Sequence, residues 1–148
     1  MACGEFGEGK LTEPSVILEY LNNYFFNISK NKKLKALVTT GPTQENIDPV
    51  RYITNHSSGL QGYEIAKSLS ENGFETTLIS GPTNLKDLPN INIIKIKTAE
   101  EMFEKTVNNL PVDVAVFAAA VSDFTFVGHV KEKIKKKETL QLLSLIHI

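Results

Sequence analysis

Residues 41–62 read GPTQENIDPVRYITNHSSGLQG and directly follow the apolar, β-branched run KALVTT at residues 35–40. A buried strand that ends in glycine is typical of α/β folds that bind nucleotides or phosphates. However, this stretch contains neither GxGxxG nor GxxxxGK[ST], and the next helical pattern begins only near Ser58. A long polar loop therefore separates the first strand from its helix, and this argues against a nicotinamide-dependent oxidoreductase.

Helical and strand patterns alternate beyond this loop. Residues 59–72 carry one apolar helical stripe, and strands are predicted at residues 74–80, 91–96 and 113–119. Between the last two strands, Thr98 and Glu101 form a capping box that begins another helix. This order predicts an α/β fold, a Rossmann-like parallel sheet with helices on both faces.

The composition excludes several classes of protein. The chain has 148 residues, enough for one compact domain, and 16 basic against 17 acidic residues argue against a general nucleic-acid binder. Its one cysteine, Cys3, cannot form an intrachain disulfide. No apolar run approaches the roughly 20 residues of a membrane helix, and the N-terminus lacks the apolar core of a signal peptide. We therefore expect a cytoplasmic protein with no nucleic-acid or membrane partner.

The first loop follows the carboxyl end of a strand, where open α/β sheets bind ligands. It ends in Ser57, Ser58 and Gly59 at a helix start, where hydroxyls, amides and the helix dipole favour an anion. An ordinary serine cap on a surface loop is the alternative. Arg51 and Asp48 of the same loop can also pair with each other and brace it.

Two further segments carry candidate chemistry. Asp123, after the fourth strand, can accept a hydrogen bond from a ribose or base, hold a metal, or merely cap the next turn. The run KEKIKKK at residues 131–137 is either a solvated surface or a lysine loop that neutralises a polyphosphate.

These motifs together resemble the phosphopantothenate–cysteine ligase family. They are GPTQENIDPVRYITNHSSG at residues 41–59, GPT at 81–83, AAAVSDF at 118–124 and EKIKKK at 132–137. The likeness is closest to the ligase domain of the bacterial bifunctional phosphopantothenoylcysteine decarboxylase/phosphopantothenate–cysteine ligases of coenzyme A biosynthesis. We read the chain as four segments: the end of the preceding flavin-dependent decarboxylase domain (1–26), a linker (27–34), the N-terminal part of the ligase domain (35–142), and a non-matching tail (143–148).

The resemblance implies a two-step reaction that uses CTP and Mg²⁺. The carboxylate of 4′-phosphopantothenate attacks the α-phosphate of CTP to give an acyl-cytidylate and pyrophosphate, and the amine of cysteine then displaces CMP. FMN belongs only to the missing decarboxylase domain, and the resemblance suggests a dimer through the ligase domain. We expect a fragment, incomplete at the C-terminus and weakly active or inactive alone. The alternative is a non-catalytic phosphopantothenate-binding or regulatory module.

The resemblance also assigns residue roles. Asn55 would contact the acyl-cytidylate, Lys133 would contact the triphosphate, and Cys3 would be a decarboxylase proton donor, idle without its domain. The residues implied to bind phosphopantothenate are Gly41, Arg51, Asn55, Ser57, Ser58, Gly59 and Gly62. The residues implied to line the nucleotide site are Phe117, Ala118, Ala119, Asp123 and Lys133. No metal ligand is assigned.

Overall fold

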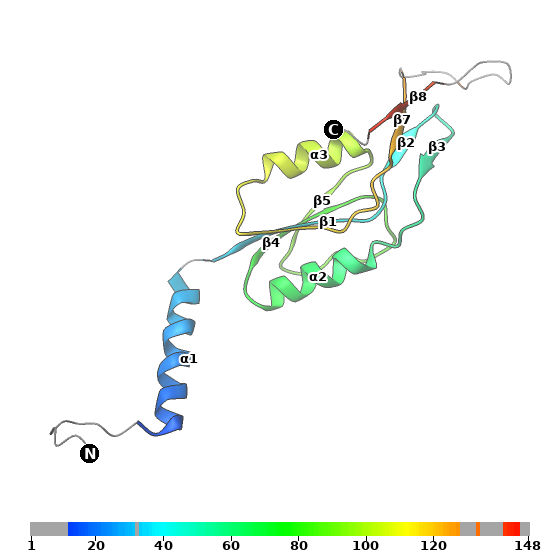
Figure 1. Ribbon diagram of the computed structural model, residues 1–148. Coiled ribbons are helices and arrows are strands. Elements are labelled where there is room, and N and C mark those ends of the chain that lie inside the picture. Colours follow the sequence, from blue (N-terminus) through cyan, green and yellow to red (C-terminus); the bar gives the residue numbers. More distant parts are fainter. Residues whose placement is uncertain (1–11, 32, 128–132, 134–140, 146–148) are drawn as a thin grey trace, which may run out of the picture. The chain divides into compact units, whose positions relative to one another are not determined.

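The computed structural model describes residues 12–31, 33–127, 133 and 141–145, and it divides into two units, residues 1–33 and 34–148. The described part of the first unit is a helix, α1 (Pro14–Asn31) (Figure 1). Pro14 occupies the first turn, where its missing N–H costs nothing. The helix continues past Phe26 into the predicted linker, because residues 27–31 contain no glycine or proline to stop it. Residues of the predicted linker are therefore helical, and their role as a linker stays a prediction.

The second unit is built on a four-stranded parallel sheet. Its strands are β1 (Lys35–Thr40), β4 (Glu75–Ser80), β5 (Asn92–Lys95) and β6 (Val114–Phe117), in the order β5-β4-β1-β6. Two helices connect them, α2 (Leu60–Glu71) and α3 (Ala99–Asn108), and they lie on opposite faces of the sheet (Figure 1). The predicted Rossmann-like α/β fold is confirmed.

Each face of the sheet has its own apolar cluster. Leu37 and Ile79 pack with Met102 of α3, whereas Val38 and Leu78 pack with Ala66 of α2. Neighbouring residues of β1 thus serve opposite faces, as the period of a strand requires. All six of these side chains are buried, which makes β1 and β4 the centre of the unit.

β6 is less buried than its apolar sequence suggested. It pairs with β1 and lies at the edge of the described sheet, with Val38 opposite Val116. Ala115 is exposed, and the exposed fraction of Phe117 is 69%. Side chains on one face of β6, Val114 and Val116, are therefore partly buried, whereas those on the other face are exposed.

The long loop after β1 contains a hairpin that the sequence did not predict. It consists of β2 (Gln44–Asn46) and β3 (Tyr52–Thr54). A second antiparallel pair joins β7 (Phe124–Phe126) to β8 (Leu142–Ser144). β8 thus includes residues of the predicted non-matching tail. In the described parts of the chain, no helix combines the length and apolarity needed to span a membrane.

Candidate functional site

The predicted loops converge at the carboxyl ends of β1, β4 and β6. Strand pairing between β1 and β6 extends into their loops, where Ala120 N donates to Gly41 O at 2.9 Å and Pro42 bridges to Ala120. Here α2 follows β1 on one face of the sheet and α3 precedes β6 on the other. This position is the topological switch point, where open α/β sheets form their ligand crevice.

Two glycines in left-handed conformation close this region. Gly41 and Gly59 have φ of 74° and 73°. A Cβ at Gly59 would lie 2.7 Å from Thr83 Cγ2 and 3.2 Å from Gly41 Cα, so the two ends of the loop and the 81–83 turn touch. Thr40 Oγ1 donates to Gly59 O at 2.6 Å and holds this arrangement. A side chain at either glycine would force the three segments apart.

The start of α2 presents hydroxyl groups and amides together. Ser57 Oγ accepts from Gly59 N at 3.2 Å, and Ser58 Oγ accepts from Leu60 N at 3.3 Å. Because each oxygen accepts from an amide, its own O–H stays available to donate. Gly62 lets the helix lie against β1, since a Cβ there would be 2.6 Å from Thr40 Cβ. The N-cap residue of α2 is Gly59, which has no side chain to cap the helix, so the segment places hydroxyl donors suited to an anion at an uncapped helix start.

Asn55 ties this loop to the loop after β6. Its Nδ2 donates to Val121 O at 2.9 Å and to Ala120 O at 3.4 Å. Two carbonyl oxygens can only accept, so they fix the orientation of the amide and direct its Oδ1 away as a free-standing acceptor group. A parallel link joins Ser122 N to Thr43 Oγ1 at 2.8 Å. The structure therefore brings the predicted catalytic asparagine to the predicted nucleotide loop.

Arg51 braces the hairpin. Its Nε donates to Asp48 Oδ2 at 2.9 Å, and Asp48 Oδ1 accepts from Val50 N and Arg51 N at 2.9 Å each. The Asp48 side chain is fully buried, whereas the Arg51 side chain is 47% exposed. Of the two roles considered for Arg51, the structure shows the bracing role.

A cavity of about 700 Å³ lies beside the loop after β6. Phe117 and Ala119 line it together with Met102, Thr125 and Leu143. Its volume falls within the range of about 300–1,000 Å³ that is usual for small-molecule sites. The walls are mostly apolar side chains of α3, β6, β7 and β8, and they suit a flat organic group better than a polyphosphate.

The other residues predicted to line the nucleotide site are not among those that line this cavity. Ala118 N donates to Thr39 O at 3.1 Å and serves the sheet. Asp123 is exposed and does not line the cavity, although its carbonyl accepts from Leu145 N at 2.7 Å. Lys133 is exposed, but residues 131–132 and 134–140 are not described, so its relation to the site stays a prediction. Cys3 lies outside the described residues.

Glu45 is a further candidate that no sequence motif indicated. This buried carboxylate of β2 accepts from Ala99 N at 2.8 Å and from Thr125 Oγ1 at 2.9 Å. It also lines the 700 Å³ cavity. A single glutamate in a polar loop carries no pattern that distinguishes it from a solvated residue.

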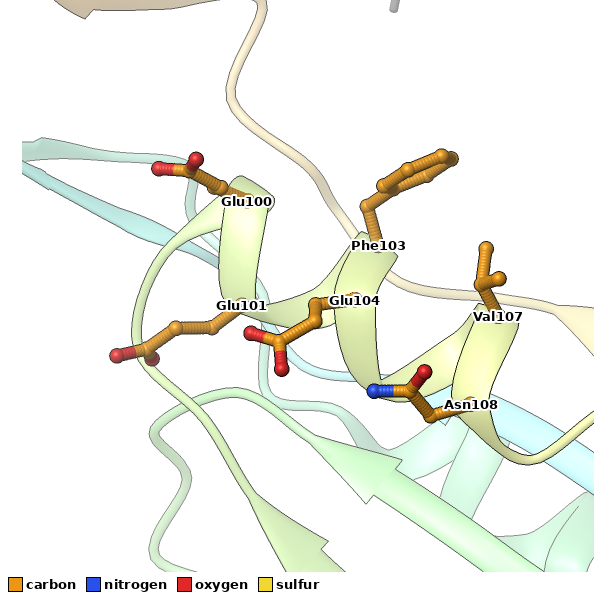
Figure 2. A pocket seen from close by; sticks show the side chains of 6 residues that line it. All are labelled: Glu100, Glu101, Phe103, Glu104, Val107 and Asn108. Atoms are coloured by element: carbon orange, nitrogen blue, oxygen red, sulfur yellow. The ribbon is translucent and has the colours of Figure 1, made fainter.

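Two further hollows differ in charge. The one on the outer surface of α3, of about 420 Å³, is bordered by Glu100, Glu101 and Glu104 (Figure 2). These like charges repel phosphate groups. The other, of about 510 Å³, adjoins the 81–83 turn, and its Lys95 pairs with Asp87 at 2.9 Å. Within the described ranges, no group of three or more His, Cys, Asp or Glu side chains could hold a metal.

Strand order, a crevice at the switch point and a helix start rich in serine and glycine define a Rossmann-like α/β domain. Residues 31–147 match the family model of the DNA/pantothenate metabolism flavoprotein C-terminal domain, and the chain belongs to this family. The resemblance stated from the motifs is confirmed. The match includes residues 143–147, which belong to the tail that we had expected not to match the family.

Curated relatives and solved structures agree with this assignment. The chain is 39% identical over 136 residues to the coenzyme A biosynthesis bifunctional protein CoaBC of Haemophilus influenzae. This alignment covers 91% of this chain and 34% of that protein. The crystal structure of a CoaBC C-terminal domain is similar, with 35% identity and a TM-score of 0.66, covering 78% of this chain and 55% of the other. A DNA/pantothenate metabolism flavoprotein from Streptococcus pneumoniae has 28% identity and a TM-score of 0.65, covering 75% and 60%. The chain thus spans about a third of the length of the curated relatives it matches.

Proposed function

We propose that this chain is part of the phosphopantothenate–cysteine ligase of coenzyme A biosynthesis. In the proposed reaction, the carboxylate of 4′-phosphopantothenate is activated by CTP as an acyl-cytidylate, and cysteine then replaces CMP to give 4′-phosphopantothenoylcysteine. The family match and the names of the relatives support the pathway. The observation that carries the site is the link between Asn55 and the loop after β6, because it joins the two segments that the ligation must bring together.

The serine–glycine segment is the proposed seat of a phosphate group. Ser57 and Ser58 keep hydroxyl hydrogens to donate, and the positive end of the α2 dipole lies beside them. Gly41 and Gly59 let the two ends of the loop lie against the 81–83 turn, and this close packing holds the start of α2 in place. Hydroxyl donors at a fixed helix start suit the phosphate of phosphopantothenate.

Asn55 is proposed to act in the second step through its Oδ1. The Nδ2 hydrogens are directed at Val121 O and Ala120 O, so the amide can offer substrate only an acceptor. An acceptor can hold an N–H of the attacking cysteine amine and aim its lone pair at the acyl carbon. Correct aim of two bound reactants contributes several kcal/mol, up to about 7–11, toward the barrier.

The nucleotide is proposed to occupy the cavity beside Phe117 and Ala119. The cavity's apolar walls suit a pyrimidine base and its volume suits a nucleoside. The charged phosphates would extend toward Lys133, and Mg²⁺ would bind through phosphate oxygens and water, as is usual for this ion. When bound, CTP supplies CMP as the leaving group, which a free carboxylate lacks.

Pyrophosphate release tests the proposal. The chain would be incubated with CTP, Mg²⁺ and phosphopantothenate, with cysteine added in a second stage, and products identified by mass spectrometry. CTP-dependent pyrophosphate release followed by 4′-phosphopantothenoylcysteine supports the function. No release by this chain, with release by a longer chain that contains it, makes the chain an inactive part of the ligase.

The alternative is a non-catalytic module that binds phosphopantothenate. It is favoured by the hydroxyl donors at the start of α2, since these suit a phosphate group without any nucleotide. Calorimetry distinguishes the two functions, since the module binds phosphopantothenate and not CTP. Binding of both ligands excludes the module.

A further inference from the structure

Glu45 joins three elements that are distant in sequence. It lies in the middle of β2 with only 5% of its surface exposed. Its Oε1 accepts from Ala99 N of α3 at 2.8 Å, and its Oε2 accepts from Thr125 Oγ1 of β7 at 2.9 Å. None of the chemistry proposed above uses this carboxylate.

The environment of Glu45 compensates its charge. Ala99 is the first residue of α3, where amides lack partners within the helix and the dipole is positive. A carboxylate there gains a charge-assisted hydrogen bond, and the Thr125 hydroxyl satisfies the second oxygen. Both buried oxygens of Glu45 therefore have a hydrogen-bond donor. Removing either donor would leave a buried carboxylate oxygen unsatisfied, which lowers stability.

Glu45, Ala99 and Thr125 all line the 700 Å³ cavity, together with Phe117 and Ala119. We propose that Glu45 is a positioning residue that holds β2 and β7 against the start of α3 and thereby sets the shape of the nucleotide cavity. The assignment of CTP to this cavity rests on the proposed function. Gln44 N also donates to Lys97 O at 2.7 Å, so β2 stays attached near α3 without Glu45, and the main loss falls on the β7 wall.

Three variants separate the two hydrogen bonds. Glu45→Ala removes both. Glu45→Gln keeps both, since its Oε1 can accept from Ala99 N while its Nε2 donates to Thr125 Oγ1, which is able to accept. Thr125→Val removes only the bond to β7 at similar volume. Glu64→Ala, at an exposed position of α2, is the matched control.

Hydrogen exchange on the ligand-free chain tests the mechanical part. Amides of Ala99 and β7 should exchange about 10-fold faster in Glu45→Ala, equivalent to the roughly 1–1.5 kcal/mol of one lost hydrogen bond, while those of β4 stay unchanged. Thr125→Val should affect β7 alone. Glu45→Gln and Glu64→Ala should behave as the unsubstituted chain.

Calorimetry tests the functional part. The Kd for CTP should rise about 10-fold in Glu45→Ala and return to within about 3-fold in Glu45→Gln, while phosphopantothenate binding changes less. Unchanged exchange at Ala99 and β7 in folded Glu45→Ala overturns the inference. CTP binding that is equal in the unsubstituted chain and Glu45→Ala overturns its nucleotide part. Failure of the unsubstituted chain to bind CTP contradicts the proposed function instead, and the exchange result still decides the coupling.

Discussion

Asn55 Nδ2 lies 2.9 Å from the carbonyl oxygen of Val121, and this hydrogen bond ties the loop before α2 to the loop after β6. The side chain is exposed, so the bond is not a consequence of burial. It fixes the Nδ2 end of the amide and leaves Oδ1 as the end that can accept from a ligand. The same residue thus links two loops and supplies an acceptor where the substrates are proposed to meet.

Replacing Asn55 with aspartate should stall the reaction after nucleotide transfer. The carboxylate has no hydrogen to donate and would face Val121 O and Ala120 O, which repel it. We expect the acyl-cytidylate to form and its conversion by cysteine to slow by about 10²–10³, the usual loss for one aimed polar group. Quenched-flow assays with mass spectrometry of the intermediate measure both steps.

Val50→Ala provides the comparison for Asn55→Asp, because Val50 is an exposed apolar side chain of the same loop and has no role in the proposed site. It should leave the second step unchanged. Normal turnover by Asn55→Asp, with no accumulated intermediate, would remove Asn55 from the proposed mechanism.

Gly62→Ala should destabilise the fold although alanine favours helices. A Cβ at this position would lie 2.6 Å from Thr40 Cβ and 3.0 Å from Thr39 O, so α2 must move away from β1. Such overpacking costs about 1–3 kcal/mol, more than the roughly 1 kcal/mol gained in helix propensity. Urea denaturation followed by circular dichroism gives the free energy of unfolding.

The exposed Ser68 of α2 supplies the control for Gly62→Ala. Ser68→Ala should be neutral or slightly stabilising, since no side chain opposes it. Equal stability of Gly62→Ala and Ser68→Ala would show that the start of α2 tolerates a gap from β1.

The sequence predicted the parts of the fold that repeat a local pattern. The strand at residues 35–40, the helix near 60–71 and the capping box at Thr98 all agree with the structure, because period, caps and turn residues act over a few positions. The strands β2 and β3 were missed because three residues are too few to show a period. A strand was predicted at 113–119, but its place at the edge of the described sheet depends on neighbours that are not encoded in the strand itself.

The candidate site was predictable only in part. The serines and glycine before α2 predicted a helix start, and the structure places them there. The bond from Asn55 to Val121 and the role of Glu45 depend on segments more than fifty positions apart, and no local pattern reports such pairs. Asp48 and Arg51 were correctly considered as a pair because they lie three positions apart.

Thr98→Ala should loosen the start of α3. The Thr98 side chain accepts from Glu101 N at 3.2 Å, and the Glu101 carboxylate accepts from Thr98 N at 3.3 Å. Losing the hydroxyl removes one half of this capping box and should cost about 0.5–2 kcal/mol of stability. Thr98→Ser keeps the oxygen and should cost much less. Denaturation midpoints of the two variants, compared at equal m-values, check the prediction, and equal midpoints would contradict it.

Asp48→Asn should weaken the hairpin more than Arg51→Lys. Asp48 accepts from two backbone amides through Oδ1 and from the Arg51 guanidinium through Oδ2. An asparagine keeps one acceptor but turns an NH₂ group toward the guanidinium inside a fully buried site, and this costs about 1–3 kcal/mol. Arg51→Lys keeps a positive charge near the carboxylate and loses only the second guanidinium contact. Hydrogen exchange at the amides of Val50 and Arg51, which donate to Asp48, should rise strongly in the first variant and weakly in the second. Faster exchange in Arg51→Lys than in Asp48→Asn would show that the guanidinium, and not the Asp48 turn, holds the hairpin together.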